Sequence, residues 1–311
     1  MKLHENPTEF HNLVSLTARE KHIPEQAVER DYYIVRSLQR LADSEYAEDC
    51  VFKGGTSLSK CYPGSIERFS EDIDLTFYAT DGLSEKQIER RLKAIEKLMT
   101  EGADTEIITA ERNNRNKSIF FWYGDRDSKI KLEIGSSVRP EPFSKRCLKT
   151  YIQEYLEAHG FDDAVDEFEL TEISLNVLNI ERTFIDKVMS VKRHAICGTL
   201  NSKVRHIYDV VRLYQMPEII TFLQDKDELK RLICLTKETD SVYLEKRNIP
   251  KEYNPLSAYD FPSWKNHFDN NIRSIYEHLH ETLLYTDEKQ SFDKAIQVFD
   301  SIDQVLSEIS E

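Results

Sequence analysis

Two aspartates stand two residues apart in the segment RFSEDIDLTFY, residues 68–78, where Asp72 and Asp74 interrupt an apolar run. In a β-strand, residues two apart point to the same face, so both carboxylates would project together. Two carboxylates on one face repel each other unless a cation lies between them. Carboxylates bind hard divalent ions such as Mg²⁺ or Mn²⁺, which activate an attacking hydroxyl and stabilise leaving pyrophosphate. The alternative is a solvated acidic strand end.

A third carboxylate, Glu133, stands among apolar residues in the segment KIKLEIGSS, residues 129–137. On a strand beside the two aspartates, it would complete a metal site. By alternation Glu133 shares a face with Lys129 and Lys131, so a polar outer face of the sheet is the alternative interpretation.

The segment KGGTSLSK, residues 53–60, contains two adjacent glycines. Gly54 and Gly55 let the backbone turn tightly and approach a ligand, while Thr56 and Ser57 stand where a helix begins. The N-terminus of a helix offers free N–H groups and a positive dipole end, which suit a phosphate. The phosphate loop of ATPases, G-x-x-x-x-G-K-[ST], does not occur. An ordinary glycine turn with a serine cap is the alternative.

These segments belong to a mixed α/β (α+β) sheet. Two helices come first, one after Asn6 and one over residues 24–41. Expected strands cover residues 51–52, 73–78, 107–109, 118–123 and 129–134; expected helices cover 58–62 and 84–99, the second with Ser84 as N-cap and Gln87 in a capping box. This order of elements indicates a mixed sheet with flanking helices.

Beyond Val177 the strand pattern fades. Helices are expected over residues 179–194, 202–214, 217–223 and 264–285, with an irregular excursion over 248–262, which carries three prolines. We therefore expect two domains, a sheet domain with N-terminal helices over 1–176 and a helical domain over 177–311.

The net charge is −14, from 42 Lys and Arg against 56 Asp and Glu, which argues against non-specific attraction to membranes or polyanions. A basic face could still exist locally, because residues 183–212 hold six basic and two acidic side chains. The basic ones are Lys187, Lys192, Arg193, Lys203, Arg205 and Arg212.

The five cysteines are widely spaced without C-x-x-C pairing, which suggests neither a disulfide framework nor a zinc site. The N-terminus MKLHENPTEF lacks the apolar run of a signal peptide, and no stretch approaches the roughly 18 apolar residues of a membrane span. We expect a cytoplasmic monomer without a membrane partner.

The run FKGGTSLSKCYPGSIERFSEDIDLTFY, residues 52–78, resembles the AbiEii/AbiGii toxin family of nucleotidyltransferases, which includes the MenT toxins and belongs to the DNA polymerase β-like superfamily. That family has a later helical lysine followed, about twenty residues on, by the pattern R-D-x-x-D. The corresponding segments here, 181–194 and 203–213, supply Lys187, Arg205 and Asp209, with His206 where the family often has Asp. The resemblance spans most of residues 20–215.

The resemblance implies roles for these residues. Asp72 and Asp74 would hold the metal ions with Glu133 as third carboxylate, and Ser57 with the Gly54–Gly55 backbone would receive the triphosphate. Lys187 would neutralise developing phosphate charge, beside Asp209 in the same motif. Further candidate nucleotide contacts are Lys53, Thr56, Lys60, Arg68 and Ser70. A solvated charge is the alternative for each lysine, and Arg205 and Asp209, four apart, could form a structural ion pair.

The implied reaction is transfer of a nucleoside monophosphate from a nucleoside triphosphate to an acceptor, with release of pyrophosphate. The resemblance implies the 3′ end of transfer RNA as acceptor, a Mg²⁺ or Mn²⁺ cofactor, and a toxin with a cognate antitoxin protein. Two alternatives stay open: transfer to a small molecule or protein side chain, and a non-catalytic nucleotide-binding or antitoxin-docking module. Ser57, Asp72 and Asp74 argue against the second, because nothing structural requires two aspartates in that strand.

Overall fold

The computed structural model describes residues 2–124, 126–244, 249, 252–282, 284–286 and 288–309. The chain divides into two compact units, which we call the sheet unit and the helical unit. The sheet unit comprises Met1–Cys61 and Phe69–Leu178, and the helical unit comprises Tyr62–Arg68 and Asn179–Glu311. A short segment between the glycine motif and the aspartate strand thus belongs to the helical unit.

The sheet has seven strands in the order β3-β4-β5-β2-β1-β7-β6. Their bounds are β1 Cys50–Lys53, β2 Asp72–Phe77, β3 Asp104–Ile107, β4 Asn116–Trp122, β5 Ile130–Gly135, β6 Phe143–Leu148 and β7 Ile173–Leu178. The pairs β2–β5 and β1–β7 are parallel and the other four pairs are antiparallel. The predicted mixed α/β sheet is confirmed.

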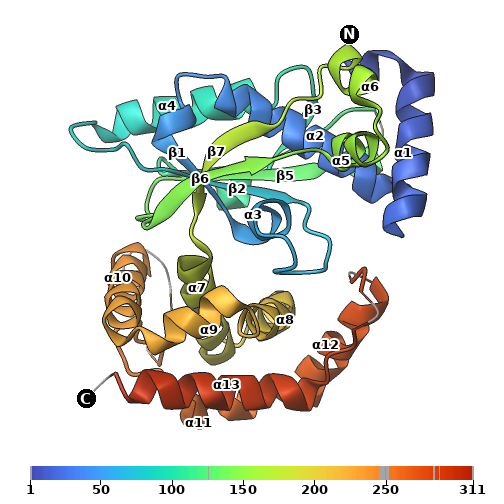
Figure 1. The fold of residues 1–311 in the computed structure, drawn as a ribbon. Helices are drawn as coiled ribbons and strands as arrows, with labels where there is room; N and C mark the ends of the chain where they lie inside the picture. The colour runs from blue at the N-terminus through green and yellow to red at the C-terminus, as the bar shows by residue number, and fades with distance from the viewer. Residues whose placement is uncertain are drawn as a thin grey trace. The chain divides into compact units, whose positions relative to one another are not determined.

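Strand β2 lies in the middle of the sheet, and its two faces differ in chemistry. Ile73 and Leu75 are buried, whereas Asp72 and Asp74 on the opposite face are partly exposed. Helix α4 (Glu85–Met99) covers the apolar face, and helix α3 (Gly54–Cys61) lies on the other side of the sheet (Figure 1). The alternation that the sequence predicts for this strand is therefore present.

The other helices of the sheet unit contact one another. They are α1 Pro7–Lys21, α2 Glu25–Ala42, α5 Tyr151–Ala158 and α6 Asp162–Glu167. Helices α1, α2 and α5 share one apolar cluster that includes Phe10, Tyr32 and Ile152. Helix α4 begins with the predicted capping box, in which the Ser84 hydroxyl accepts a hydrogen bond from the Gln87 N–H.

Three features of the sheet unit differ from the expectation. Helix α3 begins at Gly54, four residues before the expected Leu58, so the glycine motif is itself the first turn of the helix. Strands β6 and β7 and helices α5 and α6 carry no expected counterpart. Strand β6 escapes a pattern search because it is an edge strand whose central residues, Lys145 to Cys147, are exposed.

The helical unit contains α7 Ile180–Ile196, α8 Val204–Leu213, α9 Pro217–Gln224, α10 Lys226–Leu244, α11 Phe261–Trp264, α12 Asn270–Thr282 and α13 Phe292–Ser307. Of these, α10, α11 and α13 have no expected counterpart, and α12 is shorter than the helix expected over 264–285. The rings of Phe261, Trp264, Phe268 and Phe299 contact one another in its core. Residues 252–260 form no helix or strand, and the remainder of the expected excursion lies partly outside the described residues.

No helix among the described residues is both long and apolar enough to cross a membrane.

Candidate active site

The polar face of the sheet carries a row of charged side chains on three adjacent strands. Asp74 on β2 pairs in register with Lys53 on β1 and with Glu133 on β5. Asp72 pairs in the same way with Lys131 on β5. Because paired residues on neighbouring strands project to the same face, these side chains lie side by side. The structure thus brings together both predicted aspartates, Glu133 and Lys53.

Gly54 is the residue that lets helix α3 begin directly beside Asp74. Its φ of +86° lies in the region that residues with a Cβ rarely adopt. A Cβ at this position would lie only 2.2 Å from the Asp74 Oδ2 atom. Two independent constraints, backbone conformation and close approach of a carboxylate, therefore require glycine at position 54.

The hydroxyls of the glycine motif bond within the sheet unit. The Ser57 hydroxyl donates to the Gly54 carbonyl at 3.0 Å, and its side chain is fully buried. The Thr56 hydroxyl donates to the Asp72 carbonyl and lies 3.0 Å from the Ser70 hydroxyl. These bonds attach the first turn of α3 to the start of β2. Contacts of Ser57, Thr56 and Ser70 with a triphosphate stay predictions.

Lys131 lies among carboxylates on the polar face. Its ammonium is 2.6 Å from the Glu111 carboxylate and 3.4 Å from that of Glu133. Partial burial alone would lower the pKa of Lys131, but Glu111, Glu133 and Asp72 raise it above its usual value. Alternation places Lys131 only on a polar face of its strand, and no sequence pattern marks Glu111 because it lies in a turn between two strands.

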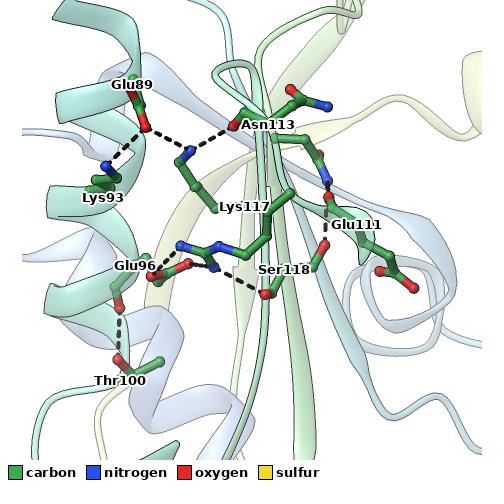
Figure 2. A network of polar contacts seen from close by, with 10 residues as sticks. Glu89, Lys93, Glu96, Thr100, Glu111, Asn113, Lys117 and Ser118 are labelled. Atoms are coloured by element: carbon green, nitrogen blue, oxygen red, sulfur yellow. Dashed lines mark hydrogen bonds and ion pairs between the residues drawn. The ribbon is translucent and has the colours of Figure 1, made fainter. Parts of the chain in front are cut away.

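The turn that carries Glu111 is fixed to helix α4 by a polar network (Figure 2). Arg112 forms an ion pair with Glu96 at 2.5 Å and donates to the Ser118 carbonyl at 3.0 Å. Lys117, which is almost fully buried, lies 3.3 Å from Glu89 and donates to the Asn113 carbonyl at 2.6 Å. Figure 2 shows Glu111 pointing away from α4. The network thus supports the carboxylate that contacts Lys131.

Two aspartates on the polar face offer the kind of ligand that a hard divalent ion prefers. Asp72 and Asp74 offer carboxylate oxygens on one face of one strand, and the missing Cβ of Gly54 leaves room for the Asp74 carboxylate. Glu133 is the register neighbour of Asp74, but its carboxylate is near Lys131. Within the described ranges no three His, Cys, Asp or Glu side chains are grouped so that they could hold a metal ion.

Lys60 has a carboxylate partner inside the sheet unit. Its almost fully buried ammonium lies 2.6 Å from the Asp31 carboxylate and 3.9 Å from the centre of the Tyr151 ring. Burial raises the pKa of Asp31 above its usual value, although the Lys60 charge and hydrogen bonds from Lys60 and Tyr151 oppose that rise. The pair joins α3, α2 and α5. A contact between Lys60 and a nucleotide stays a prediction.

The remaining predicted site residues meet within the helical unit. Asp209 on α8 is fully buried, and its carboxylate accepts two hydrogen bonds from Arg68, at 2.6 and 2.7 Å, and one from Lys187 at 2.7 Å. Burial alone would raise the pKa of Asp209, but the two cations hold it well below its usual range. Nearby, the His206 ring is 3.1 Å from the Ser190 hydroxyl. Asp209 thus orients Lys187 and fixes the segment that ends at Arg68.

The prediction of a basic face over residues 183–212 is largely wrong. Most of these basic side chains form ion pairs or hydrogen bonds inside the helical unit. Lys192 is 5% exposed and donates to the Ser257 hydroxyl and the Ala258 carbonyl. Arg193 pairs with Asp240 at 2.9 Å, and Lys187 with Asp209. Arg212 pairs with Glu67 and Glu288. A count of local charge could not reveal this, since most of these partners are remote in sequence.

The burial of Lys192 predicts a measurable pH dependence of stability. Burial, together with the charge of Lys237, lowers the pKa of Lys192 to about 8, against an ordinary value of 10.5. Between these two values the unfolded chain holds one more proton than the folded chain, so the free energy of unfolding rises as the pH rises through 8. Relative to Lys192→Met, the wild type should gain about 1 kcal/mol between pH 7 and pH 9 in urea unfolding.

Lys230→Met is the matched control for this measurement, because Lys230 is exposed on α10. Its difference from the wild type should be the same at both pH values. If the difference in unfolding free energy between Lys192→Met and the wild type is also the same at both pH values, the burial of a charged ammonium at Lys192 is contradicted.

A family model and several solved structures match this chain. The model of the family described as nucleotidyl transferase AbiEii toxin, type IV TA system, matches residues 36–298. Among solved structures, MenT4, a nucleotidyltransferase toxin from Mycobacterium tuberculosis H37Rv, is 15% identical and aligns over 95% of this chain and 98% of its own, with a TM-score of 0.51. JHP933 from Helicobacter pylori is 19% identical over 83% of this chain and 95% of its own, with a TM-score of 0.39. No curated protein sequence gives a significant match.

Because the family match covers most of the chain, including the aspartate strand and the Lys187–Asp209 helices, the protein belongs to the AbiEii family of nucleotidyltransferase toxins of type IV toxin–antitoxin systems.

Proposed function

We propose that this nucleotidyltransferase transfers a nucleoside monophosphate from a nucleoside triphosphate to the 3′ end of a transfer RNA. We further propose that the reaction depends on a divalent ion, Mg²⁺ or Mn²⁺, held by Asp72 and Asp74 with Glu133 as third ligand. The observation that carries this proposal is the register of Asp74 between Lys53 and Glu133, directly beside the start of helix α3.

In the proposed reaction, the acceptor hydroxyl loses its proton to solvent as its oxygen attacks the α-phosphorus. The bond between the α-phosphorus and the α,β-bridging oxygen breaks, and pyrophosphate leaves. When bound, a divalent ion neutralises phosphate charge and polarises the acceptor hydroxyl. The N–H groups of Gly54 and Gly55 in the first turn of α3 suit the phosphates, because helix N-termini favour anions. The internal bonds of the Ser57 and Thr56 hydroxyls make the backbone the better triphosphate contact.

The basic residues named as site candidates divide into two groups in this proposal. Lys53 lies beside Asp74 in register, where its ammonium suits a phosphate oxygen. For Lys187 the family resemblance implies neutralisation of phosphate charge, and within the helical unit its ammonium donates to the Asp209 carboxylate. Lys60 and Arg68 have carboxylate partners within their own units, so we assign them supporting roles.

The transfer RNA acceptor rests on the family resemblance, since most of the basic residues between 183 and 212 are paired or buried within the helical unit. A cognate antitoxin follows from family membership. To test the acceptor, the pure protein is incubated with Mg²⁺, total RNA and each α-labelled nucleoside triphosphate in turn. Label in transfer RNA supports the proposal. Label that appears only in small molecules or in protein contradicts it.

Asp72→Asn and Asp74→Asn should each lower the rate of label transfer at least about 100-fold, because each removes a metal ligand. The fold should persist, since losing one carboxylate also relieves repulsion between the pair. Asp81→Asn, in an exposed turn of the same unit, is the matched control and should keep full activity. Wild-type rates in both Asp72→Asn and Asp74→Asn would rule out the metal assignment.

Gly54→Ala should abolish nucleotidyl transfer although it lowers the free energy of unfolding only a little. Gly82→Ala is the matched control, because Gly82 has a similar φ of +73° but no atom within 4 Å of its Cβ position. Both substitutions should cost about 1 kcal/mol of unfolding free energy through backbone strain. Only Gly54→Ala should also turn the Asp74 carboxylate aside. Equal activities of the two variants would contradict the proposed role of Asp74.

Expression of the wild-type chain without an antitoxin should arrest bacterial growth, because modified transfer RNA would no longer be aminoacylated. Asp74→Asn should be harmless at equal protein abundance, measured by immunoblot. Growth arrest by Asp74→Asn at that abundance would point to toxicity by another mechanism.

A further inference from the structure

Lys131 on the polar face stands next to one aspartate of the proposed metal pair and forms an ion pair with Glu133. It stands in register beside Asp72 and two residues before Glu133 on the same strand. Its ammonium lies closer to Glu111, at 2.6 Å, than to Glu133, at 3.4 Å. The side chain is 22% exposed, against 44% for Glu111 and 39% for Glu133. A partly enclosed cation thus bridges two carboxylates, only one of which is a proposed metal ligand.

We propose that Lys131 is a built-in counter-cation, which keeps Glu133 paired in the metal-free protein and releases it to the Asp72–Asp74 pair when a divalent ion binds. Glu111 then keeps the ammonium. This inference rests on the metal dependence proposed above. Lys131 is a positioning residue in this account, because it acts through Glu133.

The position of Glu111 supports this exchange. The Asn116 side-chain amide donates to the Glu111 carbonyl at 2.7 Å, and the neighbouring Arg112 joins the same turn to Glu96 on α4. Glu111 is therefore carried by a turn that is fixed on both sides (Figure 2). The shorter of the two Lys131 contacts involves this anchored carboxylate, so the longer contact, to Glu133, is the one to break.

The conformation of Glu133 supports it as well. Asp74 and Glu133 are register neighbours, yet no three His, Cys, Asp or Glu side chains in the described part of the chain are grouped as a metal site. The Glu133 carboxylate lies 3.4 Å from the Lys131 ammonium. Lys131 also repels any cation beside Asp72, because like charges a few ångströms apart oppose each other. Both effects make Lys131 weaken metal binding.

Affinity for Mn²⁺ alone, measured as free Mn²⁺ by electron paramagnetic resonance with the full-length protein at neutral pH, tests the inference without a need for activity. Lys131→Met should lower the Kd on the order of tenfold. Lys129→Met, which removes an equal charge two residues away where the ammonium lies over the Phe120 ring, should change the Kd less than about threefold. Asp74→Asn should abolish the binding.

A double-mutant cycle distinguishes the release of Glu133 by Lys131 from a general effect of the Lys131 charge on metal affinity. Glu111→Gln should raise the Kd in the wild-type background, because Lys131 then stays with Glu133. In the Lys131→Met background the same substitution should have little effect. An equal effect of Glu111→Gln in both backgrounds, or a Kd for Lys131→Met that is unchanged or higher, would overturn the inference. If the wild-type protein shows no Mn²⁺ binding that Asp74→Asn abolishes, the proposed metal site is contradicted, and this inference falls with it.

Discussion

The Asp74 carboxylate lies where a side chain at residue 54 would have to be, and the arrangement of the sheet unit around the polar face depends on that contact. Strand β1 ends at Lys53, and helix α3 begins at the next residue, so the chain must turn directly against β2. The turn is possible because Gly54 has a φ of +86° and no Cβ. Parallel pairing of β2 with β5 then puts Glu133 on the other side of Asp74. A helix N-terminus, a lysine and three carboxylates are gathered through backbone geometry.

Electrostatic pairing organises the second half of the family motif in a different way. Asp209 is fully buried in the helical unit, where an unpaired carboxylate would be strongly unfavourable. Arg68 and Lys187 together satisfy it, and they come from segments more than a hundred residues apart in sequence. Removing either cation would leave the buried Asp209 carboxylate with only part of its hydrogen bonds and of its neutralising charge. The same logic explains why a chain with a net charge of −14 can contain a lysine- and arginine-rich stretch that presents little basic surface.

The sequence predicted those features that depend on local pattern. Alternation placed Asp72 and Asp74 on one face of their strand and Glu133 on a polar face of another, and the Ser84 capping box marked the start of α4. Features that depend on remote partners could not be predicted. Helical periodicity places Lys60 and Lys192 on helices, but it does not reveal that Asp31 or the Ala258 carbonyl approaches them. Edge strand β6 lacks apolar alternation, and Glu111 lies in a turn without any repeating pattern.

Anomalous diffraction can show whether the two aspartates of β2 hold a divalent ion against the nucleotide. Crystals of the protein would be grown with Mn²⁺ and a nucleoside triphosphate analogue whose α,β-bridging oxygen is replaced by methylene. We expect an anomalous peak within coordination distance of Asp72 and Asp74 carboxylate oxygens, about 2.1–2.3 Å, and of the triphosphate. Mn²⁺ and triphosphate bound together elsewhere, with both aspartates left without metal contact, would contradict it.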